Sequence, residues 1–367
     1  MRIAVNARLL IKDQLEGIGR FTFETLRRLV LSHPEVEFIF CFDRKFDPEF
    51  IFAPNVKGLV IYPQARHPFL YYIWFQLLLP KVLEREKVDL LLSPDGFLPL
   101  NTKVKTLAVI HDIAFEHFKN GVDWLHQYYY KYYFPKFAKK ATRIIAVSQF
   151  TKTDLVKTYQ LEPEKIDVIY NGVSSAFKQT DKMLKDKIPY FIYVGAIHPR
   201  KNVLNLLKAF DAFKTEHSKF QHQLLLVGRK SWKLSSVVKY LKTMKFKRDV
   251  LFNKNVSDND LNLLLNNATA LIYPSFFEGF GLPVVEGFSC GIPVITSKNT
   301  AMEEIAKGAA HLFDPNNVTE ISKRMYEQAS GKAKNQEKIN LGLTLAKQYN
   351  WDSSAEQIWQ SILKTIN

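Results

Sequence analysis

Short apolar runs alternate along this chain with longer segments whose apolar residues recur at helical spacing. This alternation predicts βαβ units, and such units form parallel sheets covered by helices on both faces. We therefore expect an α/β protein. The predicted strands are 3–5, 38–41, 90–92, 106–110 and 144–147, then 190–194, 223–227, 250–252, 270–273 and 294–296.

Helices are predicted between these strands. After the turn at 17–20, Phe21, Leu26 and Leu29 recur at helical spacing, so we expect them to face a core. Further helices are predicted at 203–213 and 258–266, and the last segment predicts an amphipathic helix. The apolar positions of that last helix are Ala355, Ile358, Trp359 and Ile362.

A polar stretch at 179–182 separates two halves that each carry their own set of strands. A chain of 367 residues is also longer than one ordinary core accommodates. We expect two Rossmann-like domains facing a cleft, where ligands commonly bind. The predicted boundaries are 1–180 for the first domain, 181–348 for the second and 349–367 for a terminal helix.

The composition, 47% hydrophobic and 24% charged, is that of a globular protein. The two cysteines, Cys41 and Cys290, have apolar neighbours, which favours a reducing, cytoplasmic setting over a disulfide framework. The first residues predict a strand and not a signal peptide. No apolar run approaches the roughly 20 residues that span a bilayer.

A formal net charge of +15 predicts a phosphate-bearing partner. The candidates are nucleic acid, an anionic membrane and a phosphorylated substrate. The chain carries no zinc-ligand spacing, no basic zipper region and no aromatic RNA-binding signature, which disfavours nucleic acid. The scattered histidines likewise indicate no metal cluster. We favour a nucleotide-sugar substrate together with the inner surface of a membrane.

Two segments combine aromatic and basic residues: 66–75, continuing to Lys81, and 124–134, followed by further lysines. Rings with interleaved Lys and Arg suit the headgroup region of a bilayer. The alternative is a pair of helices packed on the sheet, with tyrosine hydroxyls at the rim. The sequence leaves both interpretations open.

The most informative stretch is 274–286. Glu278 and Glu286 flank a turn made flexible by Gly279 and Gly281, between a predicted strand and a predicted helix. Such a turn can direct backbone N–H groups at a phosphate, while carboxylates bind sugar hydroxyls. Either glutamate alone is as well explained by a solvated surface position. Together with the glycines they predict a nucleotide-sugar site.

A second candidate is the loop 195–202, which begins with Gly195 at the end of a predicted strand. It carries Arg200 and Lys201 just before a predicted helix, whose N-terminus favours an anion. Both side chains suit a pyrophosphate. The alternative is a solvated basic loop. This alternative is less attractive because a second turn suited to a phosphate, 279–282, follows the matching strand.

Two positions in the first half are candidates as well. Gly17 and Gly19 follow the first strand and let backbone approach a ligand. The dinucleotide motif G-x-G-x-x-G is incomplete because Thr22 stands at its last position, which disfavours a nicotinamide enzyme. His111 closes the strand 106–110, where it is placed for chemistry or for a sugar hydroxyl. An ordinary turn and a loop histidine are the alternatives.

With these motifs in place, the chain resembles the retaining glycosyltransferases of GT-B architecture, and most of all the bacterial mannosyltransferase-type members that build surface polysaccharides. The pair Glu278 and Glu286, with Gly-Phe-Gly-Leu-Pro between them, is the most specific match. Weaker matches follow the family's order from Glu16 to Ile295. The resemblance implies a C-terminal helix that crosses back to the first domain.

The resemblance also implies roles for single residues. Glu286 would bind the ribose hydroxyls, Glu278 would contact the donor sugar near the reacting centre, and His111 would hydrogen-bond that sugar. Arg200 and Lys201 would neutralise the leaving pyrophosphate. The remaining donor-binding positions are Gly17, Gly19, Gly195, Phe280, Gly281 and Leu282.

The resemblance further implies a metal-independent reaction with retained anomeric configuration. The donor is then a substrate and no cofactor is needed; GDP-mannose is favoured over UDP-sugars. The acceptor would be a saccharide, with a lipid-linked one as a candidate, bound by the first domain. The alternatives are a nucleotide-sugar epimerase of the same architecture and a basic nucleic-acid-binding protein. A phosphorylase would need a pyridoxal-phosphate lysine or a free-phosphate site, which the sequence does not indicate.

Overall fold

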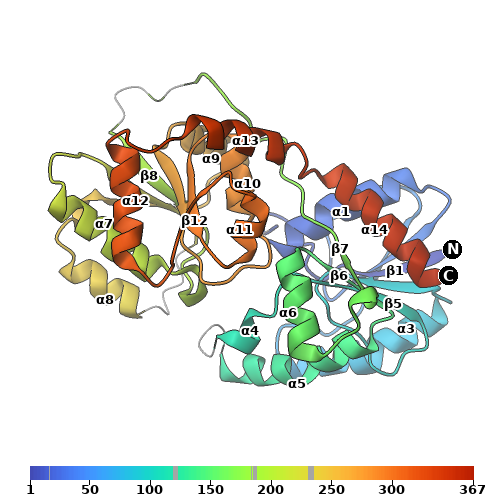
Figure 1. The fold of residues 1–367 in the computed structure, drawn as a ribbon. Helices are drawn as coiled ribbons and strands as arrows, with labels where there is room; N and C mark the ends of the chain where they lie inside the picture. The colour runs from blue at the N-terminus through green and yellow to red at the C-terminus, as the bar shows by residue number, and fades with distance from the viewer. Residues whose placement is uncertain (16, 119–122, 183, 185–187, 230–234) are drawn as a thin grey trace. The chain divides into compact units, whose positions relative to one another are not determined.

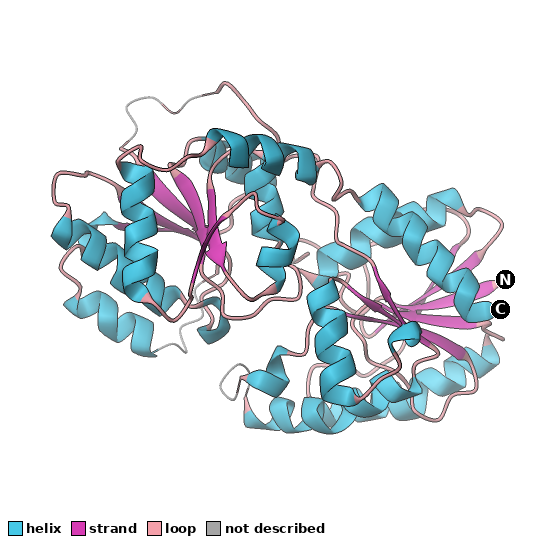
Figure 2. Ribbon diagram, in the orientation of Figure 1, coloured by secondary structure: helices cyan, strands magenta, loops and turns pink. Residues whose placement is uncertain are grey.

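The computed structural model spans residues 1–367 and describes all of them except residue 16 and the ranges 119–122, 183, 185–187 and 230–234. The chain forms two compact units. Unit 1 comprises Met1–Gly172 and Trp351–Asn367, and unit 2 comprises Val173–Asn350. Each unit contains a parallel sheet covered by helices (Figures 1 and 2).

The sheet of unit 1 has the strand order β3-β2-β1-β4-β5-β6-β7, and its pairings are parallel. The strand bounds are β1 Arg2–Asn6, β2 Glu37–Phe42, β3 Val56–Val60, β4 Leu90–Ser93, β5 Lys105–Ile110, β6 Arg143–Ala146 and β7 Ile166–Val168. The chain winds from β1 out to β3 and then returns to β4 on the other side of β1. The topological switch point of this sheet therefore lies between β1 and β4.

Helices cover both faces of this sheet. One face carries α2 Pro68–Tyr72, the π-helical turn η2 Ile73–Leu78, α3 Leu79–Arg85, α5 Trp124–Lys140 and α6 Gln149–Tyr159; α1 Ile18–Ser32 and α14 Trp351–Ile366 cover the other (Figure 1). Short turns complete the unit: η1 Pro48–Phe50, α4 Ala114–His117 and η3 Pro163–Lys165. The predicted core positions Phe21, Leu26 and Leu29 of α1 are buried.

The C-terminal helix α14 belongs to unit 1, although the 178 residues before it form unit 2. It packs on α1, where the Trp351 ring meets the Phe21 ring edge to face at 6.0 Å. The Arg28 guanidinium also contacts the Asp352 carboxylate at 2.5 Å. The expected return of the last helix to the first domain is confirmed.

The sheet of unit 2 has the order β10-β9-β8-β11-β12-β13, again parallel. The strands are β8 Tyr190–Val194, β9 Gln223–Val227, β10 Val250–Asn253, β11 Ala270–Tyr273, β12 Val294–Ser297 and β13 His311–Phe313. The helices are α7 Val203–Glu216, α8 Ser235–Thr243, α9 Asp258–Asn266, α10 Leu282–Ser289, α11 Ala301–Ala306, α12 Val318–Ala329 and α13 Gln336–Ala346, with turns η4 Pro199–Lys201 and η5 Lys247–Asp249. Helix α7 packs on α12, and α10 packs on α13, on opposite faces of the sheet (Figure 1). The switch point here lies between β8 and β11.

The prediction of two parallel α/β sheets is confirmed, and three strands were missed: β3, β7 and β13. All three lie at a sheet edge. Strands β7 and β13 have only three residues each, and β3 has a single buried residue, Val56. An edge strand is covered on one side only, so its apolar run is short or interrupted.

Within the described residues, none of the helices combines the length and the apolar character needed to cross a bilayer.

Candidate functional site

Two loops of unit 2 carry most of the predicted site residues. One is 195–202, between β8 and α7, and the other is 274–281, between β11 and α10. Since β8 and β11 are neighbouring parallel strands, both loops leave the same edge of the sheet, one on each side of the switch point. Ligands of open α/β sheets bind at this position.

The two loops bring together Arg200, Lys201 and Glu278. The Arg200 Nη1 lies 2.7 Å from one carboxylate oxygen of Glu278, and the Lys201 Nζ lies 2.6 Å from the other. Arg200 also donates to the Phe277 carbonyl at 2.8 Å. Residues predicted separately in two loops thus form one cluster, which we call the unit 2 cluster.

A fourth member of the unit 2 cluster, Tyr273, was not predicted. Its hydroxyl accepts a hydrogen bond from Lys201 Nζ at 2.6 Å and donates one to Glu278 at 3.1 Å. Burial and the neighbouring Glu278 carboxylate raise the pKa of Tyr273 well above its ordinary value. Tyr273 is the last residue of a strand that was predicted, so its place at the sheet edge could have been inferred.

The electrostatics of the unit 2 cluster favour anions. Glu278 is only 6% exposed, and burial alone would favour its neutral form. Arg200 and Lys201 outweigh this effect and lower the pKa of Glu278 to about 2. The carboxylate is therefore ionised, and two cations share one negative charge. The surplus positive charge at the switch point suits a phosphate group.

The loop 195–202 is held in place by Asn202. This residue adopts the left-handed conformation (φ 58°), which asparagine tolerates better than most residues, and it precedes α7 directly. Its buried amide donates to the carbonyls of Pro274 and Pro315 at 3.0 and 2.7 Å. The Phe276 N–H donates to the Arg200 carbonyl at 2.9 Å. These bonds tie the two loops together and fix the base of the Arg200 side chain.

Gly195 and Gly281 are required by the backbone conformation of these loops. Gly195 and Gly281 have φ values of 146° and 96°, which are strained for other residues. A Cβ at Gly281 would also lie 2.8 Å from the Met302 Cγ. At Gly228, after β9, a Cβ would lie 2.2 Å from the Gly195 carbonyl oxygen. Contact of Gly195 and Gly281 with a donor stays a prediction.

The other predicted residues of unit 2 lie in the same loop and helix as Glu278. Phe280 is buried and meets the Tyr349 ring edge to face at 5.6 Å. Leu282 begins α10, with Pro283 in its first turn, and Glu286 is a half-buried residue one turn further on. Their predicted roles toward ribose and phosphate stay predictions.

Gly17, Gly19 and His111 lie in unit 1. Gly17 precedes α1 with φ 42°, and a Cβ at Gly19 would lie 2.9 Å from the Leu9 carbonyl oxygen. The chain's own backbone approaches Gly19 closely, and the predicted contact of Gly17 and Gly19 with a ligand stays a prediction. Glu16, which belongs to the same motif, lies outside the described residues.

His111 follows β5 directly, as predicted. Its Nε2 lies 2.9 Å from the Pro94 carbonyl oxygen, which can only accept, so Nε2 carries the proton. The ring meets Phe21 edge to face at 4.9 Å. Burial lowers the pKa of His111, which keeps the imidazole neutral at physiological pH.

A polar cluster at the switch point of unit 1 was also missed. The Arg8 Nε lies 2.8 Å from the Asp95 carboxylate, and the Asn6 amide donates to Asp95 and Ser93 at 2.8 and 3.2 Å. All four side chains are buried. Asn6 and Ser93 end β1 and β4, and Arg8 and Asp95 follow these strands. Polar residues directly after two predicted strands could have indicated this cluster.

Two family models match the sequence. The model "Glycosyl transferases group 1" matches residues 175–340, and "Glycosyltransferase Family 4" matches residues 15–177. The chain belongs to the glycosyltransferases.

Curated relatives of this glycosyltransferase include the O-antigen chain mannosyltransferase B of Escherichia coli, 26% identical over 377 residues, which cover 95% of this chain and 96% of the relative. The O-antigen chain mannosyltransferase RfbU of Salmonella typhimurium is 28% identical over 265 residues, or 72% and 71% of the two chains. Among solved structures, Anabaena HepE in complex with UDP and glucose has a TM-score of 0.75 at 17% identity and covers 98% of both chains. This likeness shows the GT-B fold.

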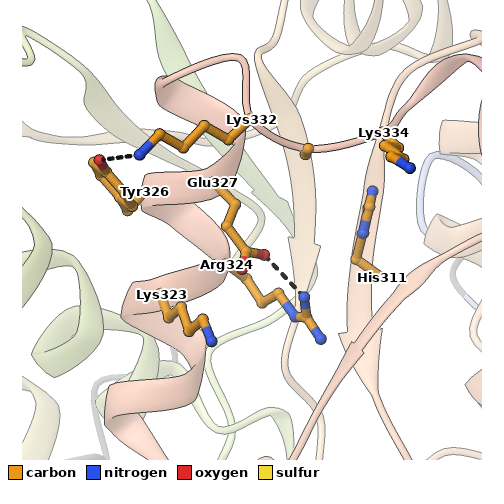
Figure 3. A pocket seen from close by; sticks show the side chains of 8 residues that line it. His311, Lys323, Arg324, Tyr326, Glu327, Lys332 and Lys334 are labelled. Atoms are coloured by element: carbon orange, nitrogen blue, oxygen red, sulfur yellow. Dashed lines mark hydrogen bonds and ion pairs between the residues drawn. The ribbon is translucent and has the colours of Figure 1, made fainter.

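Unit 2 of the glycosyltransferase also contains a basic pocket of about 440 Å³, between α12, β13 and the segment after α12 (Figure 3). It is lined by His311, Lys323, Arg324, Tyr326, Glu327, Lys332, Ala333 and Lys334. Within it, Arg324 pairs with Glu327 at 2.8 Å, and Lys332 donates to the Tyr326 hydroxyl at 3.1 Å. None of the predicted site residues lines this pocket.

Proposed function

We propose that this glycosyltransferase moves mannose from GDP-mannose to a lipid-linked saccharide in the synthesis of a surface polysaccharide. The unit 2 cluster is the observation that carries the proposal, because it presents surplus positive charge at a switch point. The names of the relatives, mannosyltransferases of O-antigen chains, support the sugar and a saccharide acceptor. A nucleotide bound to the structural neighbour HepE supports the donor class.

In the proposed reaction, the bond between the anomeric carbon and the diphosphate oxygen breaks, and its electron pair leaves with the diphosphate. Arg200 and Lys201 would stabilise the developing negative charge. Preorganised donors of this kind contribute about 3 kcal/mol each in enzymes where they have been removed. Because the charge is met by protein cations, we propose that no metal ion is required.

We further propose that the anomeric configuration is retained. The acceptor hydroxyl would form its new bond on the face that the diphosphate leaves, and its proton would pass to the leaving phosphate oxygen. Glu278, held ionised by two cations, would contact the donor sugar, and Glu286 the ribose. The neutral His111, whose Nε2–H is donated to the Pro94 carbonyl, would accept a hydrogen bond from a sugar hydroxyl at Nδ1.

Binding of a panel of GDP-, UDP-, ADP- and dTDP-sugars to the purified full-length protein tests the donor. We expect GDP-mannose to bind most tightly and Glu286→Ala to abolish that binding. Glu337→Ala is a matched control, since Glu337 is an exposed glutamate of α13 in the same unit. No binding across the panel, or equal loss in the control, would contradict the proposal.

The same preparation separates the alternatives. An epimerase would convert the donor sugar without any acceptor, and a nucleic-acid-binding protein would bind arbitrary duplex with steep salt dependence. Transfer in the presence of excess EDTA, with the product anomer assigned by NMR, tests metal independence and retention. Loss of transfer in EDTA would contradict metal independence, and an inverted product would contradict retention.

A further inference from the structure

The two aromatic-basic segments form neighbouring helices on one face of the unit 1 sheet. The rings of Tyr71, on α2, and Tyr129, on α5, are 5.4 Å apart, and both are buried. Trp74, Phe134 and the other inward rings pack in the same core. The alternative of a helix pair packed on the sheet is therefore right for the inner sides of these helices, but it leaves their outer sides unexplained.

The outer sides carry large apolar side chains in solvent. We call them the aromatic face, which consists of Phe69, Tyr72, Leu77, Trp124, Tyr128 and Tyr132. On α5, Trp124, Tyr128 and Tyr132 are 79%, 68% and 49% exposed. Among the described residues, six aromatic side chains are strongly exposed, and five of them belong to this face. The sixth, Tyr62, lies shortly before α2.

Lysines interleave with these rings. Residues 124–140 contain four lysines and no aspartate or glutamate. Trp124, Tyr128 and Tyr132 follow one another at four-residue spacing, and Lys136 continues the row with its Nζ 3.3 Å from the centroid of the Tyr132 ring. Across the neighbouring segment the exposed row of Phe69, Tyr72 and Leu77 likewise ends at an exposed lysine, Lys81.

We propose that the aromatic face docks this enzyme onto the surface of an anionic lipid bilayer. Trp and Tyr side chains settle at the boundary between headgroups and acyl chains, and nearby Lys side chains are attracted to anionic headgroups. A second copy of the chain is disfavoured as the occupant, since a two-fold contact would bring the lysines of both copies together.

The position of the face relates the proposal to the reaction. On its inner side, the Tyr71 ring lies 5.8 Å from the His126 ring of α5 and 5.3 Å from the Arg8 guanidinium. The aromatic face thus begins beside the carboxyl ends of β1 and β4. A bilayer bound there would place its headgroups next to unit 1, to which the proposed function assigns the lipid-linked acceptor. In this respect the inference rests on the proposed function.

Sedimentation of the full-length protein with phosphatidylcholine vesicles, with and without phosphatidylglycerol, tests the inference. We expect binding to the anionic vesicles only. The triple variant Lys136→Gln, Lys139→Gln, Lys140→Gln should bind roughly 100-fold more weakly, at about fivefold per lysine. The triple variant Trp124→Ser, Tyr128→Ser, Tyr132→Ser should lose binding as well, and its exposed positions leave the fold intact.

The basic pocket of unit 2 supplies the matched control. Lys323→Gln, Lys332→Gln, Lys334→Gln removes the same charge from a surface outside the aromatic face (Figure 3). We expect this variant to bind vesicles like the wild type. Equal loss in both lysine variants would overturn the inference, because it would show attraction by net charge alone. A wild type that dimerises and binds no vesicles would also overturn the inference if the aromatic variant no longer dimerises.

Trp124 provides a second readout. The other tryptophans that the structure describes, Trp74, Trp351 and Trp359, are buried. Anionic vesicles should shift the fluorescence to shorter wavelength, and Trp124→Phe should abolish the shift. GDP-mannose binding without vesicles separates the two proposals: a protein that binds the donor but no vesicle contradicts only the docking, and one that binds vesicles but no donor contradicts only the proposed function.

Discussion

Each unit places an arginine–carboxylate contact at the switch point of a parallel sheet, and the two contacts differ in composition. In unit 1, Arg8 pairs with Asp95 alone, and its guanidinium lies 4.6 Å from the centroid of the Phe97 ring. In unit 2, Glu278 faces both Arg200 and Lys201.

Under the proposed function, this difference fits one architecture to two kinds of binding site. The unit 1 pair is electrically balanced and enclosed by rings, which suits a fixed wall beside a neutral saccharide. The unit 2 cluster has one more cation than it has carboxylates, which suits a diphosphate. The following predictions test that contrast, from the largest expected effect to the smallest.

Removing one partner of the unit 1 pair should destabilise the fold. Asp95→Ala leaves the Arg8 guanidinium buried without its carboxylate, and such a change costs about 3–5 kcal/mol of unfolding free energy. Urea denaturation followed by circular dichroism measures it. The double variant Arg8→Met, Asp95→Leu should lose less, because no charge is left unpaired. Unchanged stability in Asp95→Ala would show that the pair does not support unit 1.

Removing a cation of the unit 2 cluster should slow catalysis while the fold persists. Arg200→Ala and Lys201→Ala should each lower kcat by about 10²–10³, the range seen when one donor to a developing charge is lost. Transfer assays at saturating donor measure this effect. Lys323→Ala is the control. Near-normal rates in Arg200→Ala and Lys201→Ala would show that these two residues do not stabilise the leaving group.

The same cluster should make stability depend on acid. The pKa of Glu278 is lowered from 4.5 to about 2, so its ionised form is favoured by folding. That stability is fully present above about pH 5 and is lost as the pH falls toward 2. Between about pH 6 and about pH 3 the wild type should lose about 2 kcal/mol more unfolding free energy than Glu278→Gln. Parallel pH profiles of the two proteins would contradict the ion pairing.

Under the proposed function, Glu278 would compete with a bound diphosphate for the two cations. Glu278→Gln should therefore bind GDP about tenfold more tightly, which corresponds to about 1.4 kcal/mol, even though turnover falls. Calorimetric titration with GDP at neutral pH measures the change. Glu286→Gln, which alters the proposed ribose contact, should weaken binding instead. Weaker GDP binding in Glu278→Gln would mean that the carboxylate supports the phosphate site.

The sequence predicted the parts of the fold that have continuous apolar runs. Strands β8, β9 and β11 were predicted to the residue because central strands are buried on both faces. The edge strands β3 and β7 were not predicted, because an edge strand has a neighbour on one side only and its apolar run is short or interrupted.

The site was predictable where glycine turns mark a strand end, as at Arg200, Lys201 and Glu278. Tyr273 and the Arg8–Asp95 pair were missed for a different reason. Arg8 and Asp95 lie 87 residues apart in sequence, and their pairing depends on β1 and β4 being neighbours in the sheet. No local pattern tells which polar residue after a strand is buried and which partner it meets.

Hydrogen–deuterium exchange of the full-length protein with and without GDP tests the central claim most directly. We expect GDP to protect the backbone amides of the loops 195–202 and 276–282 in unit 2, and to leave 93–97 of unit 1 unchanged. Protection confined to the unit 1 segment, or none in unit 2 at saturating GDP, would contradict the claim that the two-cation cluster binds the diphosphate.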